Sequence, residues 1–342
     1  MNQNIQLRLK YIDGLRALAC FLVVLTHSAL PSVTGTDGIW KFLISFMCSP
    51  ATQIFFAISG ALLIKPNIQT KPFLKKRLLR LLPPVIFWSV ITMVVYAWLD
   101  KNGWEESLWR IVLFPFQPVI GIYWFIYVII GLYFLTPILS GFVVKANRRT
   151  IEFYLFLWGI TLLLPYLNLL DIPYWAIYNS KGSYYHPLIY FGGYAGFFLL
   201  GYYLKNYPIV IGMNKRFVVV ILGTVLCMGV TLGIKLADTD AKMDDYLNIG
   251  QLFYTTILFT VFQNLPKRFL QYKIWNTIAV YSFGIYLMHP IIVRELVWKF
   301  AEHYRMHALL ETPLIAIVSL FICWGGLTLI SRFPKTKWIT GI

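Results

Sequence analysis

The sequence predicts an all-α fold, a polytopic membrane bundle of about ten transmembrane helices. Hydrophobic residues make up 58% of the 342 residues and charged residues only 13%, whereas a soluble domain is about half apolar and about a quarter charged. Several apolar stretches reach the roughly 18 residues that a transmembrane helix needs. An aromatic content of 18% with few charges excludes a disordered chain. The lack of short alternating segments excludes a transmembrane β-barrel.

The spans follow from apolar runs that end at charges, glycine or proline. Ten such runs use most of the chain, so we expect one membrane domain over residues 1–342. The segment from Glu105 to Pro118 is too short and too interrupted to span, and we expect it to lie in the outer interface of the membrane. The predicted spans are residues 11–30, 43–64, 81–99, 121–143, 151–170, 188–204, 217–237, 246–264, 275–294 and 313–331.

The loops between these spans predict the orientation, because cytoplasmic loops of membrane proteins collect lysine and arginine. One side of the membrane receives 20 positive charges, and the other receives nine that are mixed with twelve carboxylates. Both termini are therefore predicted to be cytoplasmic. The nine outer basic residues are Lys41, Lys101, Arg110, Lys181, Lys235, Lys242, Arg294, Lys299 and Arg305.

The net charge of +16 fits this topology better than nucleic-acid binding, because the basic residues lie in short loops between apolar runs. No nucleic-acid partner is expected. The four cysteines lie within or at the ends of apolar runs and show no CxxC spacing. The sequence therefore predicts neither a disulfide framework nor a metal site.

Three ionisable residues interrupt the first predicted span, where charges are costly and usually functional. Arg16 and His27 are eleven positions apart, so on a helix they lie within about 20° of the same face and roughly 16 Å apart. Asp13 precedes Arg16 by three residues and can pair with it. A histidine inside a bundle suits a general base, and a buried arginine suits a carbonyl, phosphate or oxyanion. The alternative is that Asp13 and Arg16 snorkel to the interface and His27 ends a helix.

The basic segment from Lys71 to Arg80 precedes the third predicted span. Arg77 and Arg80 are one helical turn apart, so they face the same way beside Lys76. Such a cluster is typical of a phosphate-binding surface. The alternative is a topology signal or a contact with the headgroups of membrane lipids.

Taken together, five segments resemble the integral-membrane acyltransferase family three, in order and on matching spans. Asp13-Gly14-Leu15-Arg16, followed after ten residues by His27, resembles the Arg-x10-His signature of that family. The similarity covers nearly the whole chain. The other four segments are Phe55-Phe56-Ala57-Ile58-Ser59-Gly60, Arg77-Leu78-Leu79-Arg80, Tyr123-Trp124-Phe125 and Ser282-Phe283-Gly284-Ile285-Tyr286-Leu287-Met288-His289-Pro290.

The resemblance implies an enzyme of the bacterial inner membrane that passes an acyl group, most often acetyl, from cytoplasmic acyl-CoA to a carbohydrate hydroxyl at the outer face. Acetyl-CoA is the implied donor, without a metal. The acceptor is a lipid-linked or other envelope carbohydrate, with O-antigen, common antigen, exopolysaccharide and peptidoglycan all open. The implied site has His27, Arg16 and Asp13 as catalytic residues, Arg77, Arg80, Lys76 and Ser59 holding the donor, and Tyr123, Trp124, Tyr286 and His289 contacting the acceptor.

The expected mechanism uses His27 as a general base on a sugar hydroxyl that attacks the thioester, with Arg16 or an aromatic hydroxyl stabilising the developing charge. An acyl-imidazole on His27 is the main variant. Ser59-Gly60 is expected to provide close helix approach near the cytoplasmic end of the second span, rather than a nucleophile. Two other classes stay open: a secondary transporter of an anionic metabolite, and a non-catalytic scaffold of envelope polysaccharide assembly.

Overall fold

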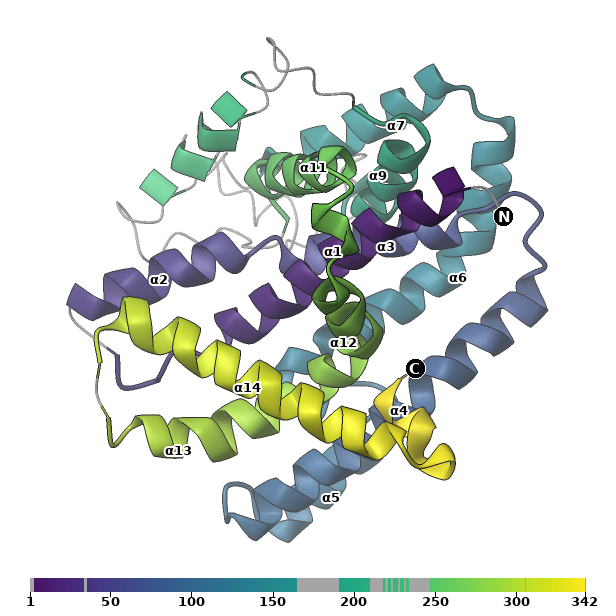
Figure 1. Ribbon diagram of the computed structural model, residues 1–342. Coiled ribbons are helices and arrows are strands. Elements are labelled where there is room, and N and C mark those ends of the chain that lie inside the picture. Colours follow the sequence, from purple (N-terminus) through teal and green to yellow (C-terminus); the bar gives the residue numbers. More distant parts are fainter. Residues whose placement is uncertain are drawn as a thin grey trace. The chain divides into compact units, whose positions relative to one another are not determined.

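A computed structural model describes residues 3–33, 36–164, 191–209, 247–304 and 306–341, together with parts of 218–233. These described residues form helices joined by turns and contain no β-strand, which confirms the predicted all-α class (Figure 1). The predicted span 217–237 lies mostly outside the described residues, and the predicted spans 151–170 and 188–204 lie partly outside them.

The chain divides into two compact units. The first unit comprises Met1–Leu15, Thr52–Ile68 and Leu135–Leu270. The second unit comprises Arg16–Ala51, Gln69–Phe134 and Gln271–Ile342. Each unit therefore combines segments that are distant in the sequence, and a single membrane domain over the whole chain stays a prediction.

Five stretches in the described part of the chain are long and apolar enough to cross a membrane. Helix α1 (Gln3–Thr26) is not one of the five, because Lys10, Asp13 and Arg16 interrupt its apolar run. These stretches support a multi-pass membrane protein, whereas the count of ten spans and the cytoplasmic position of both termini stay predictions. The five are Asp37–Leu63, Thr70–Trp98, Gly121–Lys145, Lys273–Ala301 and Ala308–Ser331.

The first unit packs around α9, which contacts both α7 and α11. Asparagine side chains cap two of these helices: Asn147 accepts from the backbone of Thr150 at the start of α7, and Asn248 accepts from that of Gln251 at the start of α11. Such caps satisfy backbone N–H groups that have no partner within the helix. The helices of this unit are α3 (Ala51–Leu63), α7 (Arg148–Thr161), α9 (Ala195–Asn206) and α11 (Ile249–Asn264).

Glycines let α3 and α9 approach each other at backbone distance. A Cβ atom on Gly60 would lie 1.7 Å from the carbonyl oxygen of Phe198, and one on Gly201 would lie 1.8 Å from that of Ala57. No side chain fits at either position. The prediction that Gly60 allows close helix approach is therefore confirmed. Gly196 has the same function beside the indole of Trp158.

The second unit is organised around α12, which packs against α4 and α14. Helix α14 also contacts α2, as the ribbon shows (Figure 1). The C-terminal 3-10 helix η7 closes this unit, because the Trp88 indole of α4 donates a hydrogen bond of 3.1 Å to the Ile339 carbonyl. The elements are α2 (Thr36–Cys48), α4 (Thr70–Trp98), α5 (Trp104–Val112), η1 (Gly121–Tyr123), α12 (Lys273–Ile291), the π-helical turn η6 (Ile292–Val297), α13 (Trp298–Ala301), α14 (Ala308–Ser331) and η7 (Pro334–Thr340), with α6 (Trp124–Lys145) beginning here.

Three helix boundaries differ from the predicted spans. Helix α4 begins at Thr70, so the basic segment expected to precede the third span forms the first turns of that helix. The predicted span 43–64 is divided into α2 and α3, since Pro50 follows the end of α2 and lacks the N–H that would continue it. Helix α1 ends at Thr26, which leaves His27 in the turn that follows.

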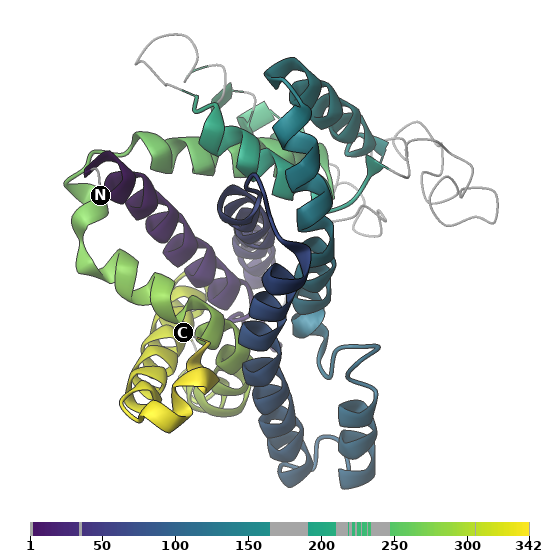
Figure 2. The same cartoon turned by 90° about the vertical axis from the view of Figure 1, so that its right-hand side faces the viewer.

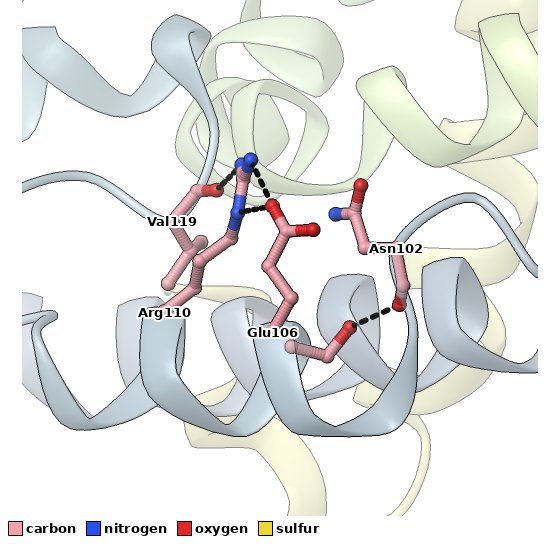
Figure 3. Close-up of polar contacts among 5 residues, drawn as sticks. Asn102, Glu106, Arg110 and Val119 are labelled. Carbon is pink, nitrogen blue, oxygen red and sulfur yellow. Dashed lines mark hydrogen bonds and ion pairs between the residues drawn. The ribbon is translucent and has the colours of Figure 1, made fainter.

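Helix α5 folds back beside the end of α4 (Figure 2). Its Arg110 donates to Glu106 at 2.7 Å and 3.0 Å and to the Val119 carbonyl at 3.2 Å, which ties the helix to the chain that follows (Figure 3). Trp104, Leu108 and several other apolar side chains around this helix are exposed. Exposed apolar groups beside charges suit an interfacial helix, and that location stays a prediction.

Candidate active site

Two histidines from distant parts of the sequence meet in the second unit. His27 lies in the turn that ends α1, where its backbone N–H donates to the Val24 carbonyl at 3.1 Å. His289 lies near the end of α12 and is completely buried. The two imidazole rings stack, with centroids 5.4 Å apart and planes inclined by 29°. The structure thus brings together two residues that the predicted topology placed near the same level of the membrane.

The proline after His289 determines how that imidazole is hydrogen-bonded. Pro290 has no N–H, so the Tyr286 carbonyl four residues earlier has no regular helical donor. The His289 Nδ1 lies 2.7 Å from that carbonyl and 3.2 Å from the Ile285 carbonyl. Two acceptors place the ring proton on Nδ1, which leaves Nε2 as a hydrogen-bond acceptor. Nε2 is buried and has no hydrogen-bond partner among the described residues.

Tyr123 and Tyr286, both predicted to contact an acceptor, use their hydroxyls to join the chain before α6 to α12. The Tyr123 hydroxyl donates to the Leu287 carbonyl at 2.6 Å, and the Tyr286 hydroxyl donates to the Ile122 carbonyl at 2.5 Å. The Tyr286 ring also lies 6.0 Å from the His289 ring. Both hydroxyls are therefore engaged by the backbone. Trp124 is half-buried at the first position of α6.

Arg294 is a further candidate for this site, to which the sequence analysis gave no role, because it stands among the outer basic residues at the end of a predicted span. The structure places it in η6, a π-helical turn that directly continues α12. Its guanidinium interacts electrostatically with both His27 and His289. π-Helical turns occur frequently at functional sites, and a turn of this kind is not visible in the sequence.

A tryptophan holds Arg294 and the end of α1 together. The Arg294 Cζ lies 5.9 Å from the centroid of the Trp298 ring, a cation–π contact. The Trp298 indole N–H donates to the Ser28 carbonyl at 3.0 Å. Because Ser28 directly follows His27, one side chain fixes the positions of the guanidinium and of the histidine.

The predicted phosphate-binding arginines form a second cluster in the same unit. Tyr133 of α6 interacts electrostatically with Arg16, Arg77 and Arg80. Phe73 packs against this cluster, since its ring lies 6.4 Å from the Tyr133 ring and 5.7 Å from the Arg77 Cζ. The Arg77 Nε is buried and has no hydrogen-bond partner among the described residues. The Tyr133 phenol is therefore within electrostatic range of three guanidinium groups.

The structure also places three other predicted site residues. Lys76 is exposed on α4, next to Arg77. Asp13 and Ser59 belong to the first unit. No group of three or more histidine, cysteine, aspartate or glutamate residues that could hold a metal ion occurs among the described residues.

Comparisons with known proteins agree with the resemblance found in the sequence. A family model described as an acyltransferase domain matches residues 9–328. Proteins of Staphylococcus aureus strains MSSA476 and MRSA252, each named a probable poly-beta-1,6-N-acetyl-D-glucosamine export protein, are 25% identical over 99% of this chain and 97% of their own length. A Staphylococcus epidermidis protein with the same name is 25% identical over 61% of each chain. No solved structure matches. Because the family model covers nearly all residues, the chain belongs to acyltransferase family 3.

Proposed function

We propose that this protein is a membrane O-acyltransferase that moves an acetyl group from cytoplasmic acetyl-CoA to a hydroxyl of a cell-envelope carbohydrate at the outer face of the bacterial inner membrane. The observation that carries the proposal is the stacked pair of His27 and His289, 5.4 Å apart, in a chain of acyltransferase family 3. Acyl transfer to an alcohol needs a base, and imidazole is the side chain best suited to that task near neutral pH.

The donor is proposed to bind through the cluster of Arg16, Arg77 and Arg80 around Tyr133. Acyl-CoA carries several phosphates, and guanidinium groups bind phosphate through paired hydrogen bonds. The buried, unpartnered Nε of Arg77 supports an anionic ligand there. Arg16 and His27 are eleven positions apart, at the two ends of a stretch of α1 and its final turn, roughly 16 Å of helix. An extended pantetheine arm has a comparable reach, so phosphates near Arg16 would leave the thioester near His27.

His27 is the proposed general base because it is the more accessible of the two histidines. The acceptor hydroxyl attacks the thioester carbon, its proton moves to His27, and the carbonyl electrons move to oxygen. Collapse of the adduct breaks the carbon–sulfur bond, and His27 returns the proton to the leaving thiolate. His289 is proposed to position His27 by stacking against its ring. The Nε2 lone pair of His289 offers an incoming hydroxyl a second hydrogen-bond acceptor. The acyl-imidazole variant uses the same residues.

The acceptor is proposed to be a polymer of N-acetylglucosamine, because the curated relatives are named for that polysaccharide. Their name also favours a second candidate function, export of the polymer across the membrane. If the protein is an exporter, a scaffold or an anion transporter, we expect that it forms no acyl bond.

Purified protein incubated with labelled acetyl-CoA and β-1,6-linked N-acetylglucosamine oligosaccharides tests the proposal. We expect label on the sugar hydroxyl, and His27→Ala should lower the rate by about 100- to 10,000-fold. His303→Ala is the matched control, since His303 is an exposed histidine whose Nδ1 contacts only the Lys299 carbonyl. No transfer by the unmodified protein, combined with loss of surface polymer in a deletion strain, would favour export.

A reaction without acceptor distinguishes the two transfer mechanisms. Direct attack predicts that labelled acetyl-CoA leaves no label on the protein. Label recovered on His27 after rapid quenching would replace direct attack by the acyl-imidazole variant. Arg77→Gln should raise the Kd for CoA in the same preparation, whereas Arg110→Gln removes an exposed arginine from α5 and should not.

A further inference from the structure

The geometry points to Arg294 as a catalytic residue: its guanidinium donates hydrogen bonds to the carbonyl oxygen of the acyl thioester while that oxygen gains negative charge beside His27. This inference rests on the proposed acyl transfer and adds a residue to it. Sequence analysis placed Arg294 among outer basic residues without a role.

Arg294 is a cation without a local counter-ion. It forms no ion pair with any residue that the structure describes, and its Nε is buried without a hydrogen-bond partner. The neighbouring Glu295 pairs with Lys101 instead, through its Oε1 at 2.6 Å. A buried donor without an acceptor costs free energy, about 1–3 kcal/mol for a neutral group and more for a charged one. The Arg294 side chain is therefore placed to donate a hydrogen bond to an oxygen atom of a bound substrate.

The position of Arg294 relative to the base is fixed by packing. The Arg294 guanidinium lies against the Trp298 ring, and the Trp298 indole N–H donates to the carbonyl of Ser28, the residue directly after His27. The guanidinium interacts electrostatically with both imidazoles. Because Trp298 contacts both the guanidinium and the residue directly after His27, Arg294 lies on the side of the site where His27 would act.

The groups expected from the sequence to stabilise the oxyanion are occupied elsewhere. The aromatic hydroxyls of Tyr123 and Tyr286 donate to backbone carbonyls. Arg16 belongs to the cluster around Tyr133, at the other end of this part of α1. Arg294 is the guanidinium that the structure associates with both histidines, and it fills the role that these other groups leave open.

The proposed step adds no reactant to the transfer. The acceptor oxygen bonds to the thioester carbon, its proton goes to His27, and the carbonyl electron pair moves to oxygen, where Arg294 donates to it. When the carbon–sulfur bond breaks, the carbonyl reforms and the hydrogen bonds to Arg294 weaken. Stabilisation that is strongest in the tetrahedral state raises kcat more than it lowers KM.

Kinetics of Arg294 variants in the full-length protein test this role, with acetyl-CoA and the oligosaccharide acceptor. Arg294→Gln should lower kcat by about 100- to 1,000-fold, the effect of losing an oxyanion donor, while KM for acetyl-CoA changes little. Arg294→Lys should be intermediate, since it keeps the charge and loses the fork of donors. Lys299→Gln, which removes an exposed positive charge from α13, is the matched control and should keep the unmodified kcat.

Chemical rescue separates this role from a loss of folding. Millimolar guanidinium should restore part of the rate of Arg294→Ala and none of the rate of His27→Ala. The inference alone would be overturned by an unchanged kcat in Arg294→Gln while His27→Ala is inactive, or by a loss confined to KM. Failure of guanidinium to raise the rate of a folded Arg294→Ala would also overturn it. Absence of any transfer by the unmodified protein would overturn both the inference and the proposed function.

Discussion

Replacing Gly60 by alanine should separate α3 from α9. The added Cβ would lie 1.7 Å from the Phe198 carbonyl oxygen, whereas real Cβ atoms stay at least 3.0 Å from such neighbours. The two helices must therefore move apart by more than an ångström. The obstructing atoms belong to the backbone, so no side-chain rotation can relieve the clash.

The size of the effect follows from two opposing contributions. Overpacking a core costs about 1–3 kcal/mol, and a backbone obstruction places Gly60→Ala at the upper end of that range. Alanine in place of glycine returns about 1 kcal/mol of helix propensity. The net loss of stability is about 2 kcal/mol, which lowers the midpoint of thermal unfolding by about 3 °C in a chain of 342 residues.

Thermal unfolding in detergent, followed by helical circular dichroism, measures this change. Gly141→Ala is the control, since Gly141 lies in α6 with nothing within 4 Å of its added Cβ. That variant should be more stable by up to about 1 kcal/mol, the helix-propensity gain alone. A Gly60→Ala protein as stable as the unmodified one would refute the close approach of α3 and α9.

Two further changes test the second unit. Tyr123→Phe removes the hydrogen bond to the Leu287 carbonyl, so the free energy of unfolding should fall by about 1–2 kcal/mol while kcat is unchanged. A lower kcat would show that the Tyr123 hydroxyl contacts a substrate. Trp298→Phe keeps an aromatic ring beside Arg294 but removes the indole N–H that donates to the Ser28 carbonyl. If this hydrogen bond contributes about 1 kcal/mol to holding His27 in place, its loss should lower kcat about fivefold. An unchanged kcat would show that Trp298 does not position His27.

Apolar length and charge boundaries predicted most helices of the described chain, because both are local properties of the sequence. Helix α4 began earlier than expected, since Lys71 to Arg80 were assigned to a loop by their charge although they form regular helical turns. The break between α2 and α3 was missed because Pro50 stands inside a continuous apolar run.

The site was predicted in part. Spacing on one helix related Arg16 to His27, and resemblance added His289, but only the fold brings the rings of His27 and His289 together. The hydroxyls of Tyr123 and Tyr286 have backbone partners that no sequence pattern indicates. Arg294 was missed because a π-helical turn extends the helix beyond the apolar run that predicted its end.

The bond between His289 and the Tyr286 carbonyl makes two adjacent residues depend on each other. With any other amino acid at position 290, a main-chain N–H would compete for that carbonyl, and the imidazole would be released to rotate or to exchange its proton between nitrogens. The proline without the histidine would leave the carbonyl unpaired in an apolar interior. We therefore expect homologous chains to gain or lose His289 and Pro290 together.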